Sequence, residues 1–101
     1  MQEVIDEYTM LRRILRTPNI RILLLIMSGK NRWSDFEKVM NKRQVSEALG
    51  ELIELGVIKA IEKKKGLKTY HVYEITDLGK YLLRRLDDAE SKLRESLKHG
   101  V

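Results

Sequence analysis

"NKRQVSEALGELIELGVIKAIEKKKGLKTYHVYEITDLGKYLL", residues Asn41–Leu83, decides the fold because its hydrophobic period changes twice. Apolar residues first recur every three or four positions, which predicts an amphipathic helix. From Val57, two runs rich in β-branched and aromatic residues flank a lysine-rich segment with one glycine, which predicts a β-hairpin over 57–75. The helical period returns after Thr76. The stretch therefore predicts a helix, a hairpin with a lysine-rich tip, and a second helix.

The ends of these two helices carry capping signals. Asn41 and Gln44 have the spacing of a capping box, and Gly56 is placed to end the first helix. Thr76 and Asp77 are expected to cap the second helix, which runs to about Lys98. The apolar face of the first helix is Val45, Ala48, Leu49, Leu52 and Leu55.

The residues before Asn41 predict three more helices. An apolar stripe predicts a helix over residues 2–16, and "TPN" breaks it, with Thr17 as a cap. The next helix, from Pro18 to Ser28, is nearly all apolar and is expected to be the core helix. Ser34 and Glu37 have capping-box spacing and predict a short helix. Its inward-facing residues are expected to be Phe36, Val39 and Met40. A short third strand through Arg32 and Trp33 would join the hairpin.

Composition narrows the function classes. The 101 residues carry a net charge of +5, which favours a polyanionic partner such as nucleic acid or an acidic membrane surface. The absence of cysteine excludes disulfides and thiolate chemistry. With two histidines, no phosphate-binding glycine loop and no metal-ligand spacing, we expect no enzyme, cofactor or metal site. The longest apolar run, "ILLLIM", is far shorter than the roughly 20 residues of a membrane span. We therefore expect a cytoplasmic protein.

Two motifs carry a resemblance to a known family. They are "L-x-x-L-x-x-x-G-V-I" at Leu49–Ile58 and "Y-x-I-T-D-x-G-K" at Tyr73–Lys80. With the helix order, they make the chain resemble the winged helix-turn-helix transcription regulators of the MarR, PadR and HxlR kind, over about Ile20 to Leu83. The resemblance implies a mostly α fold with a small β-hairpin wing and a DNA-binding dimer. It also implies a third helix in the major groove and a wing on the backbone or in the minor groove. The short segment "SDFEKVM" and the acidic third helix depart from the family pattern.

The implied division of the chain has three parts. They are an N-terminal dimerisation helix at 1–16, a winged helix-turn-helix DNA-binding domain at 17–76, and a C-terminal dimerisation helix at 77–101.

The outer face of the helix after Asn41 offers groups that read bases. Arg43 can bond guanine and Gln44 can bond adenine, and Lys42 at the edge suits phosphate. The other residues assigned to this DNA-binding face are Ser46 and Glu47. Glu47 and Glu51 oppose this assignment, because carboxylates repel phosphates unless they accept from cytosine or pair with Arg43. The alternative is a solvated helix face on which Gln44 only closes the capping box.

The hairpin has the densest positive charge of the chain. Between Lys59 and Lys68 there are five lysines and one acid, Glu62, whereas residues 73–101 hold six basic and six acidic side chains. Lysines there suit phosphate contact, although edge-strand lysines also prevent pairing between molecules. The lysines assigned to DNA are Lys63, Lys64, Lys65 and Lys68. Leu67 at the tip is expected to pack down on the hairpin, with insertion into a groove as the alternative.

The terminal helices predict a homodimer. Leu82, Leu86, Ala89 and Leu93 are spaced like a short coiled-coil seam, on a helix longer than the small domain can cover. The N-terminal stripe that would complete the interface is Val4, Tyr8, Leu11 and Leu15. The alternative is that the two helices fold on each other within one chain.

Three functions fit these patterns. The first is a homodimeric DNA-binding transcription regulator that binds double-stranded DNA and acts as a repressor. The second is an architectural DNA-binding protein of low sequence specificity, and the third is a protein-interaction winged helix in which the basic hairpin is incidental. The sequence does not identify an effector.

Overall fold

The computed structural model describes residues 7–99, which form five helices and one two-stranded antiparallel sheet. The helices are α2 (Thr9–Ile14), α3 (Thr17–Met27), α4 (Trp33–Glu37), α5 (Lys42–Glu54) and α6 (Asp77–Lys98). The strands are β1 (Ile58–Lys65) and β2 (Lys68–Ile75). The coarse prediction of a mostly helical fold with one hairpin and a long C-terminal helix is confirmed. None of the helices in residues 7–99 is long and apolar enough to cross a lipid bilayer.

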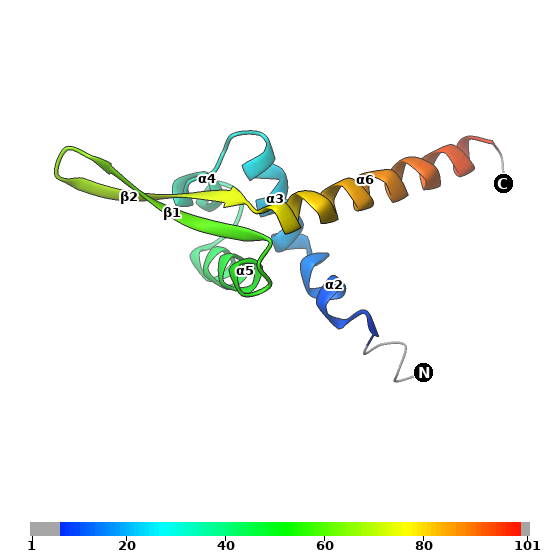
Figure 1. Ribbon diagram of the computed structural model, residues 1–101, viewed down its shortest axis with the longest axis horizontal. Coiled ribbons are helices and arrows are strands. Elements are labelled where there is room, and N and C mark those ends of the chain that lie inside the picture. Colours follow the sequence, from blue (N-terminus) through cyan, green and yellow to red (C-terminus); the bar gives the residue numbers. More distant parts are fainter. Residues whose placement is uncertain (1–6, 100–101) are drawn as a thin grey trace.

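The molecule has a small body with two arms. Helices α3, α4 and α5 pack together at the base of the hairpin, and the hairpin projects from one side of this body while α6 projects from the other (Figure 1). The described residues measure 58 × 33 × 26 Å along the principal axes, so the shape is elongated. The lysines of the hairpin and the apolar seam of α6 therefore lie on arms that point away from each other (Figure 1).

The core is built from the apolar faces of the helices. Fully buried side chains come from α3 (Ile22, Leu23), α4 (Phe36) and α5 (Val45, Leu52), and the strand residue Ile58 closes the core against the hairpin. The predicted apolar face of α5 is confirmed, except that Leu55 is only partly buried. The predicted capping box also forms. Asn41 Oδ1 accepts from the Gln44 amide at 2.8 Å, and Gln44 Oε1 accepts from the Asn41 amide at 3.2 Å.

The predicted N-terminal helix is wrong in its extent and in part of its stripe. Helix α2 ends at Ile14, which is its buried residue, while Leu15 is 45% exposed. The backbone then becomes extended at Arg16, which is the N-cap of α3, so that Thr17 is helical and does not cap. Because α2 ends two residues before the predicted end at residue 16, the four-residue spacing no longer carries Leu15 to the core side. Val4 lies outside the described residues.

The start of α4 also differs from the prediction. The side chain of Asp35, rather than that of Glu37, reaches back to cap, accepting from the Arg32 amide at 3.1 Å, and Ser34 lies inside the helix. Because α4 ends at Glu37, helical spacing does not apply to Val39, which is 47% exposed. No third strand forms among the described residues. Instead, a single backbone hydrogen bond of 2.9 Å from Tyr73 to Asn31 ties this loop to the hairpin.

Helix α3 contributes Ile22 and Leu23 to the core as predicted, although Leu24 and Met27 on its other side are each more than half exposed. One other burial expectation is wrong. Leu67 does not pack on the hairpin and is entirely exposed at its tip.

A tight junction fixes the root of α6. The Thr76 amide donates to the Val57 carbonyl at 3.0 Å, and the Thr76 hydroxyl donates to the Gly56 carbonyl at 2.6 Å. The same hydroxyl accepts from the Gly79 amide at 3.1 Å, which caps α6 as predicted. Gly79 is buried, and a Cβ there would overlap the Val57 carbonyl oxygen and lie 2.6 Å from Ile75 Cγ2. These contacts explain the threonine and the glycine of "Y-x-I-T-D-x-G-K". Thr76 forms the hydrogen bonds of the junction, and Gly79 has no side chain that would collide with Val57.

This junction predicts opposite effects for two helical glycines. Gly79→Ala should lower the free energy of unfolding by about 1–3 kcal/mol, because the added methyl meets backbone that cannot move away. Gly50→Ala is the matched control, since a Cβ at Gly50 in α5 meets nothing within 4 Å. It should raise stability by about 0.5–1 kcal/mol through helix propensity. Urea unfolding followed by circular dichroism at one fixed protein concentration measures both, and equal stability of the two variants would contradict the prediction.

Candidate nucleic-acid interface

The N-terminal half of α5 exposes all of its predicted DNA-binding residues. They are Lys42, Arg43, Gln44, Ser46 and Glu47. Arg43 Nε lies 3.0 Å from Glu47 Oε1, with side chains that are 87% and 66% exposed. An ion pair this exposed is worth little and opens easily. The Gln44 side-chain oxygen accepts from the Asn41 amide in the capping box, so a bidentate contact with adenine, which also uses this oxygen, competes with the cap.

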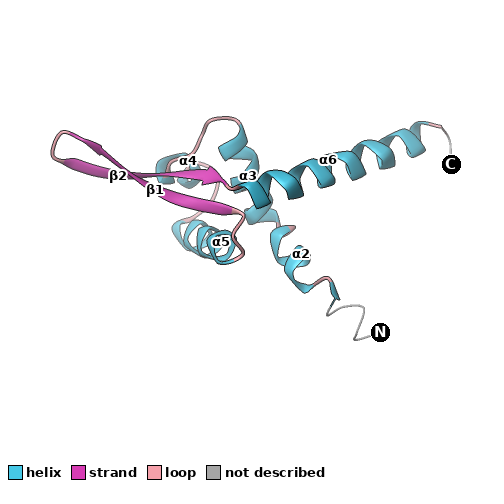
Figure 2. Cartoon of the chain, in the orientation of Figure 1, coloured by secondary structure: helices cyan, strands magenta, loops and turns pink. Residues whose placement is uncertain are grey.

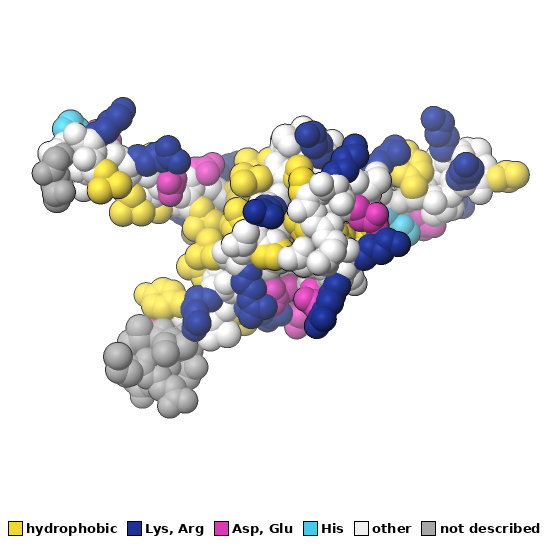
Figure 3. All heavy atoms as spheres, turned by 180° about the vertical axis from the view of Figure 1, so that it is seen from behind, with side chains coloured by type: hydrophobic (Ala, Val, Ile, Leu, Met, Phe, Trp, Pro, Cys, Tyr) yellow, Lys and Arg dark blue, Asp and Glu magenta, His cyan; other side chains and the backbone are white. Residues whose placement is uncertain are grey.

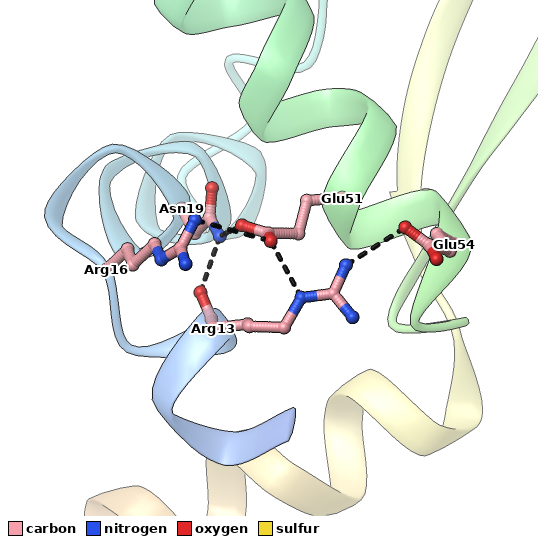
Figure 4. A network of polar contacts seen from close by, with 5 residues as sticks. All are labelled: Arg13, Arg16, Asn19, Glu51 and Glu54. Atoms are coloured by element: carbon pink, nitrogen blue, oxygen red, sulfur yellow. Dashed lines mark hydrogen bonds and ion pairs between the residues drawn. The ribbon is translucent and has the colours of Figure 1, made fainter. Parts of the chain in front are cut away.

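Glu51, which the sequence suggested would repel phosphates, does not belong to this exposed face. Its carboxylate accepts from Arg13 Nε at 2.8 Å and from Asn19 Nδ2 at 2.8 Å, and Arg16 lies 3.5 Å away (Figure 4). Asn19 is 2% exposed and also donates to the Arg13 carbonyl at 2.6 Å. Arg13 donates in addition to Glu54 at 2.9 Å. The network joins α2, α3 and α5 through one carboxylate.

These contacts shift the pKa values of both partners in the direction of their charged forms. The hydrogen bond from Arg13, followed by that from Asn19, lowers the pKa of Glu51, and the hydrogen bonds to Glu51 and Glu54 raise the pKa of Arg13. The charges of Arg13 and Arg16 are thus partly neutralised within the chain.

The hairpin presents positive charge on one face. Successive side chains of a strand alternate between faces, and directly opposed residues share one. The register pairs Lys59 with Glu74, Lys63 with Tyr70, and Lys65 with Lys68 on one face. The other face pairs Glu62 with His71 and Lys64 with Thr69. The predicted lysine set therefore divides: Lys63, Lys65 and Lys68 share a face with Lys59, and Lys64 points to the opposite side beside Glu62.

The hairpin twists strongly along its length. The strands cross in projection between the base and the tip (Figure 2), as expected for a two-stranded ribbon. At the base, Ile58, Tyr73 and Ile75 turn the opposite face toward the core. The twist therefore rotates the lysine-bearing face away from its direction at the base as the hairpin leaves the body.

Arg32 extends this face toward the body, and sequence reasoning missed it. Its guanidinium lies 4.3 Å from the centre of the Tyr70 ring, and Tyr70 is the cross-strand partner of Lys63. The nearby carboxylates of α4 are already engaged, since Asp35 accepts from the Arg32 amide and Glu37 from the Trp33 indole. The exposed Arg32 side chain thus joins the hairpin cations. No local sequence signal could show this, because the contact spans 38 positions.

The predicted dimer residues lie on the other side of the molecule and differ in exposure. Tyr8, Leu15 and Leu93 are 53%, 45% and 64% exposed, and Ala89 is exposed. Leu11, Leu82 and Leu86 are half-buried, and Leu82 packs against the chain's own core. The structure adds exposed apolar residues that were not expected there. They are Met10, Leu24, Met27, Leu78, Tyr81 and Leu97.

Comparison with protein-family models, curated proteins and solved structures finds no match for this chain. What these surfaces bind therefore has to be inferred from their own residues.

The Glu51 network predicts a pH dependence of stability. The folded pKa of Glu51 is below its ordinary value of 4.5, so the unfolded chain binds the proton more tightly. The network therefore stabilises the folded state fully above pH 4.5, the ordinary pKa of glutamate. This stabilisation is lost as the pH falls through the lower pKa of Glu51 in the folded state. Glu51→Gln should flatten the drop in urea midpoint between neutral pH and about pH 3 relative to the wild type. Glu54→Gln, at a carboxylate that is 69% exposed, serves as the control and should leave the drop nearly unchanged. Identical pH profiles for wild type and Glu51→Gln would contradict the assignment.

Proposed function

We propose that the chain is a DNA-binding winged-helix transcription regulator, in which α5 reads the major groove and the hairpin holds the DNA backbone. The observation that carries this proposal is the hairpin face with four lysines and one glutamate. None of the hairpin lysines takes part in an ion pair within residues 7–99. Free ammonium groups on one projecting face suit phosphates, which are bound by charge and without regard to sequence.

The N-terminal end of α5 is suited to contact a DNA groove. Lys42 and Arg43 lie in its first turn, and the helix begins in an extended, capped loop that leaves this turn open to solvent. A guanine offers Arg43 two acceptors in place of the Glu47 carboxylate, and the released carboxylate can accept from cytosine. Sequence preference would then come from Arg43 and Glu47 together, with Lys42 on phosphate and Ser46 beside the bases.

The opposite side of the molecule supports pairing with a second copy. Most of the large apolar side chains that are exposed belong to α2, α3 and α6. Hydrophobic side chains gather where the α6 arm joins the body, whereas Lys and Arg side chains follow the hairpin (Figure 3). Met27 also borders a groove of about 490 Å³ between α3, β2 and α6. Exposed apolar side chains gathered in this way suit an interaction surface, and a two-fold partner would place two α5 helices on one duplex. Occupying an operator in this way would make the dimer a repressor.

One observation favours an architectural protein of low sequence specificity as a second candidate. Arg43 is bonded to Glu47 and Gln44 is held in the cap, so the two best base-reading groups already have partners. The hairpin would then provide the affinity and α5 little discrimination. Selection of bound fragments from random DNA separates the two, since only the regulator enriches a motif.

The division of the hairpin lysines predicts unequal effects for two neighbours. Lys63→Ala should reduce the slope of log affinity against log salt by about 0.9, because one phosphate contact is lost. Lys64→Ala, which removes the same charge from the opposite face, should leave the slope close to that of the wild type. Fluorescence anisotropy with duplex DNA over a salt series measures both. Equal slopes for the two variants would refute the assignment of faces, and no binding by the wild type would refute the proposed function.

The apolar side of α6 predicts a dimer that one charge can weaken. Leu93→Lys should raise the dissociation constant of the dimer at least tenfold, because a lysine cannot be desolvated there without cost. Ser91→Lys introduces the same side chain two residues away on the polar side of the helix and should leave the dimer intact. Sedimentation equilibrium measures the mass of each, and a monomeric wild type would contradict the proposal.

A further inference from the structure

The tip of the hairpin presents a leucine where a polar residue is usual. Gly66 and Leu67 form a two-residue turn between the opposed residues Lys65 and Lys68. Gly66 has φ of 63° and Leu67 does not have a positive φ, which fits a type II′ turn with glycine in its first central position. The second position of such turns usually holds Asn, Ser or Asp. Here it holds Leu67, which is 106% exposed.

Leu67 differs from the other exposed apolar residues in its surroundings. Single exposed hydrophobic residues are common and usually need no explanation. Most of the others in this chain lie on the apolar side formed by α2, α3 and α6. Leu67 instead lies in the turn at the outer end of the hairpin, with Lys65 on one side of the turn and Lys68 on the other. An apolar tip framed by two cations matches a site that is apolar inside and anionic at both rims.

We propose that Leu67 is a wedge that enters the minor groove, partly unstacks one base step and bends the DNA; this rests on the proposed DNA-binding function. Apolar wedges of this kind kink the duplex toward the major groove. The minor groove is about 6 Å wide, and its two rims are phosphate backbones. Lys65 and Lys68 form the rung directly behind the turn, so their ammonium groups can reach the two rims while Leu67 enters between them.

The proposed wedge would give the protein a second activity besides DNA binding, namely bending of the duplex. The hairpin lysines alone would hold DNA without changing its shape. With Leu67 inserted, the protein bends the duplex and prefers steps that unstack easily, such as TA or CA/TG. Such a preference arises without any hydrogen bond to a base.

The test compares wild type, Leu67→Asn and Leu67→Met on duplexes with a central TA step. Because the side chain makes no packing contacts at the tip, both variants should fold as the wild type does. End-to-end energy transfer measures the bend, and 2-aminopurine placed at the step reports unstacking. We expect the wild type and Leu67→Met to bend the DNA and raise the 2-aminopurine signal. Leu67→Asn should lose both signals and about tenfold in affinity, with an unchanged salt slope.

The other outcomes are distinguishable. If Leu67→Asn bends DNA as the wild type does, the wedge is refuted while DNA binding stands. If the wild type binds no duplex, the proposed function itself fails. Binding to phosphatidylserine vesicles is measured in parallel, because a leucine between two lysines also suits an anionic membrane surface. Loss of vesicle binding in Leu67→Asn with unchanged DNA bending would replace the wedge by a membrane contact.

Discussion

The arrangement of the whole molecule depends on the close approach of Gly79 to the Val57 carbonyl. The end of α5, the start of β1, the end of β2 and the start of α6 all meet there. The hydrogen bonds from Thr76 to Gly56 and Val57 hold the ends of these four elements together. Because Gly79 has no Cβ, the backbone of α6 can come close enough for these hydrogen bonds to form. A helix, a hairpin and a second helix that are separate in sequence thereby acquire fixed directions relative to one another. The two arms leave the body on opposite sides for this reason.

The distribution of charge is decided by tertiary contacts more than by composition. The net charge of +5 is a sum over the whole chain and does not say where cations are free. Arg13 and Arg16 are drawn to Glu51, whose carboxylate also holds the buried Asn19. The cost of burying Asn19 beside the partly buried Glu51 is offset by these mutual bonds, as buried polar groups require. Within residues 7–99 the lysines of the hairpin form no ion pair, so the proposed attraction for DNA is concentrated on that arm.

Local patterns predicted local structure, and the misses follow from contacts that a local pattern does not contain. The period of α5, the Asn41–Gln44 capping box and the hairpin were evident because each depends on residues a few positions apart. Ser34 and Glu37 have the spacing of a capping box, but the N-cap of α4 is Arg32, two residues before Ser34, and Asp35 has the role expected of Glu37. Alternation along β1 already separates Lys64 from Lys63 and Lys65, but Lys68 could not be assigned to a face because that needs the register of β1 against β2. Glu51 was taken for a surface carboxylate because its partner Arg13 lies 38 positions away in the sequence.

The same junction links the two proposed surfaces mechanically. The α6 arm would set how two copies pair, and α5 with the hairpin would set how each copy meets DNA. Because α6 extends well beyond the body, a small rotation at its root moves its far end by a large distance. Two winged helices on one duplex need a fixed separation of about 34–36 Å between their reading helices. A root that is hydrogen-bonded and sterically closed keeps that separation constant, whereas a flexible linker would not. The Glu51 network would act in the same sense, since it anchors α2, on the proposed pairing side, to α5, on the proposed DNA side.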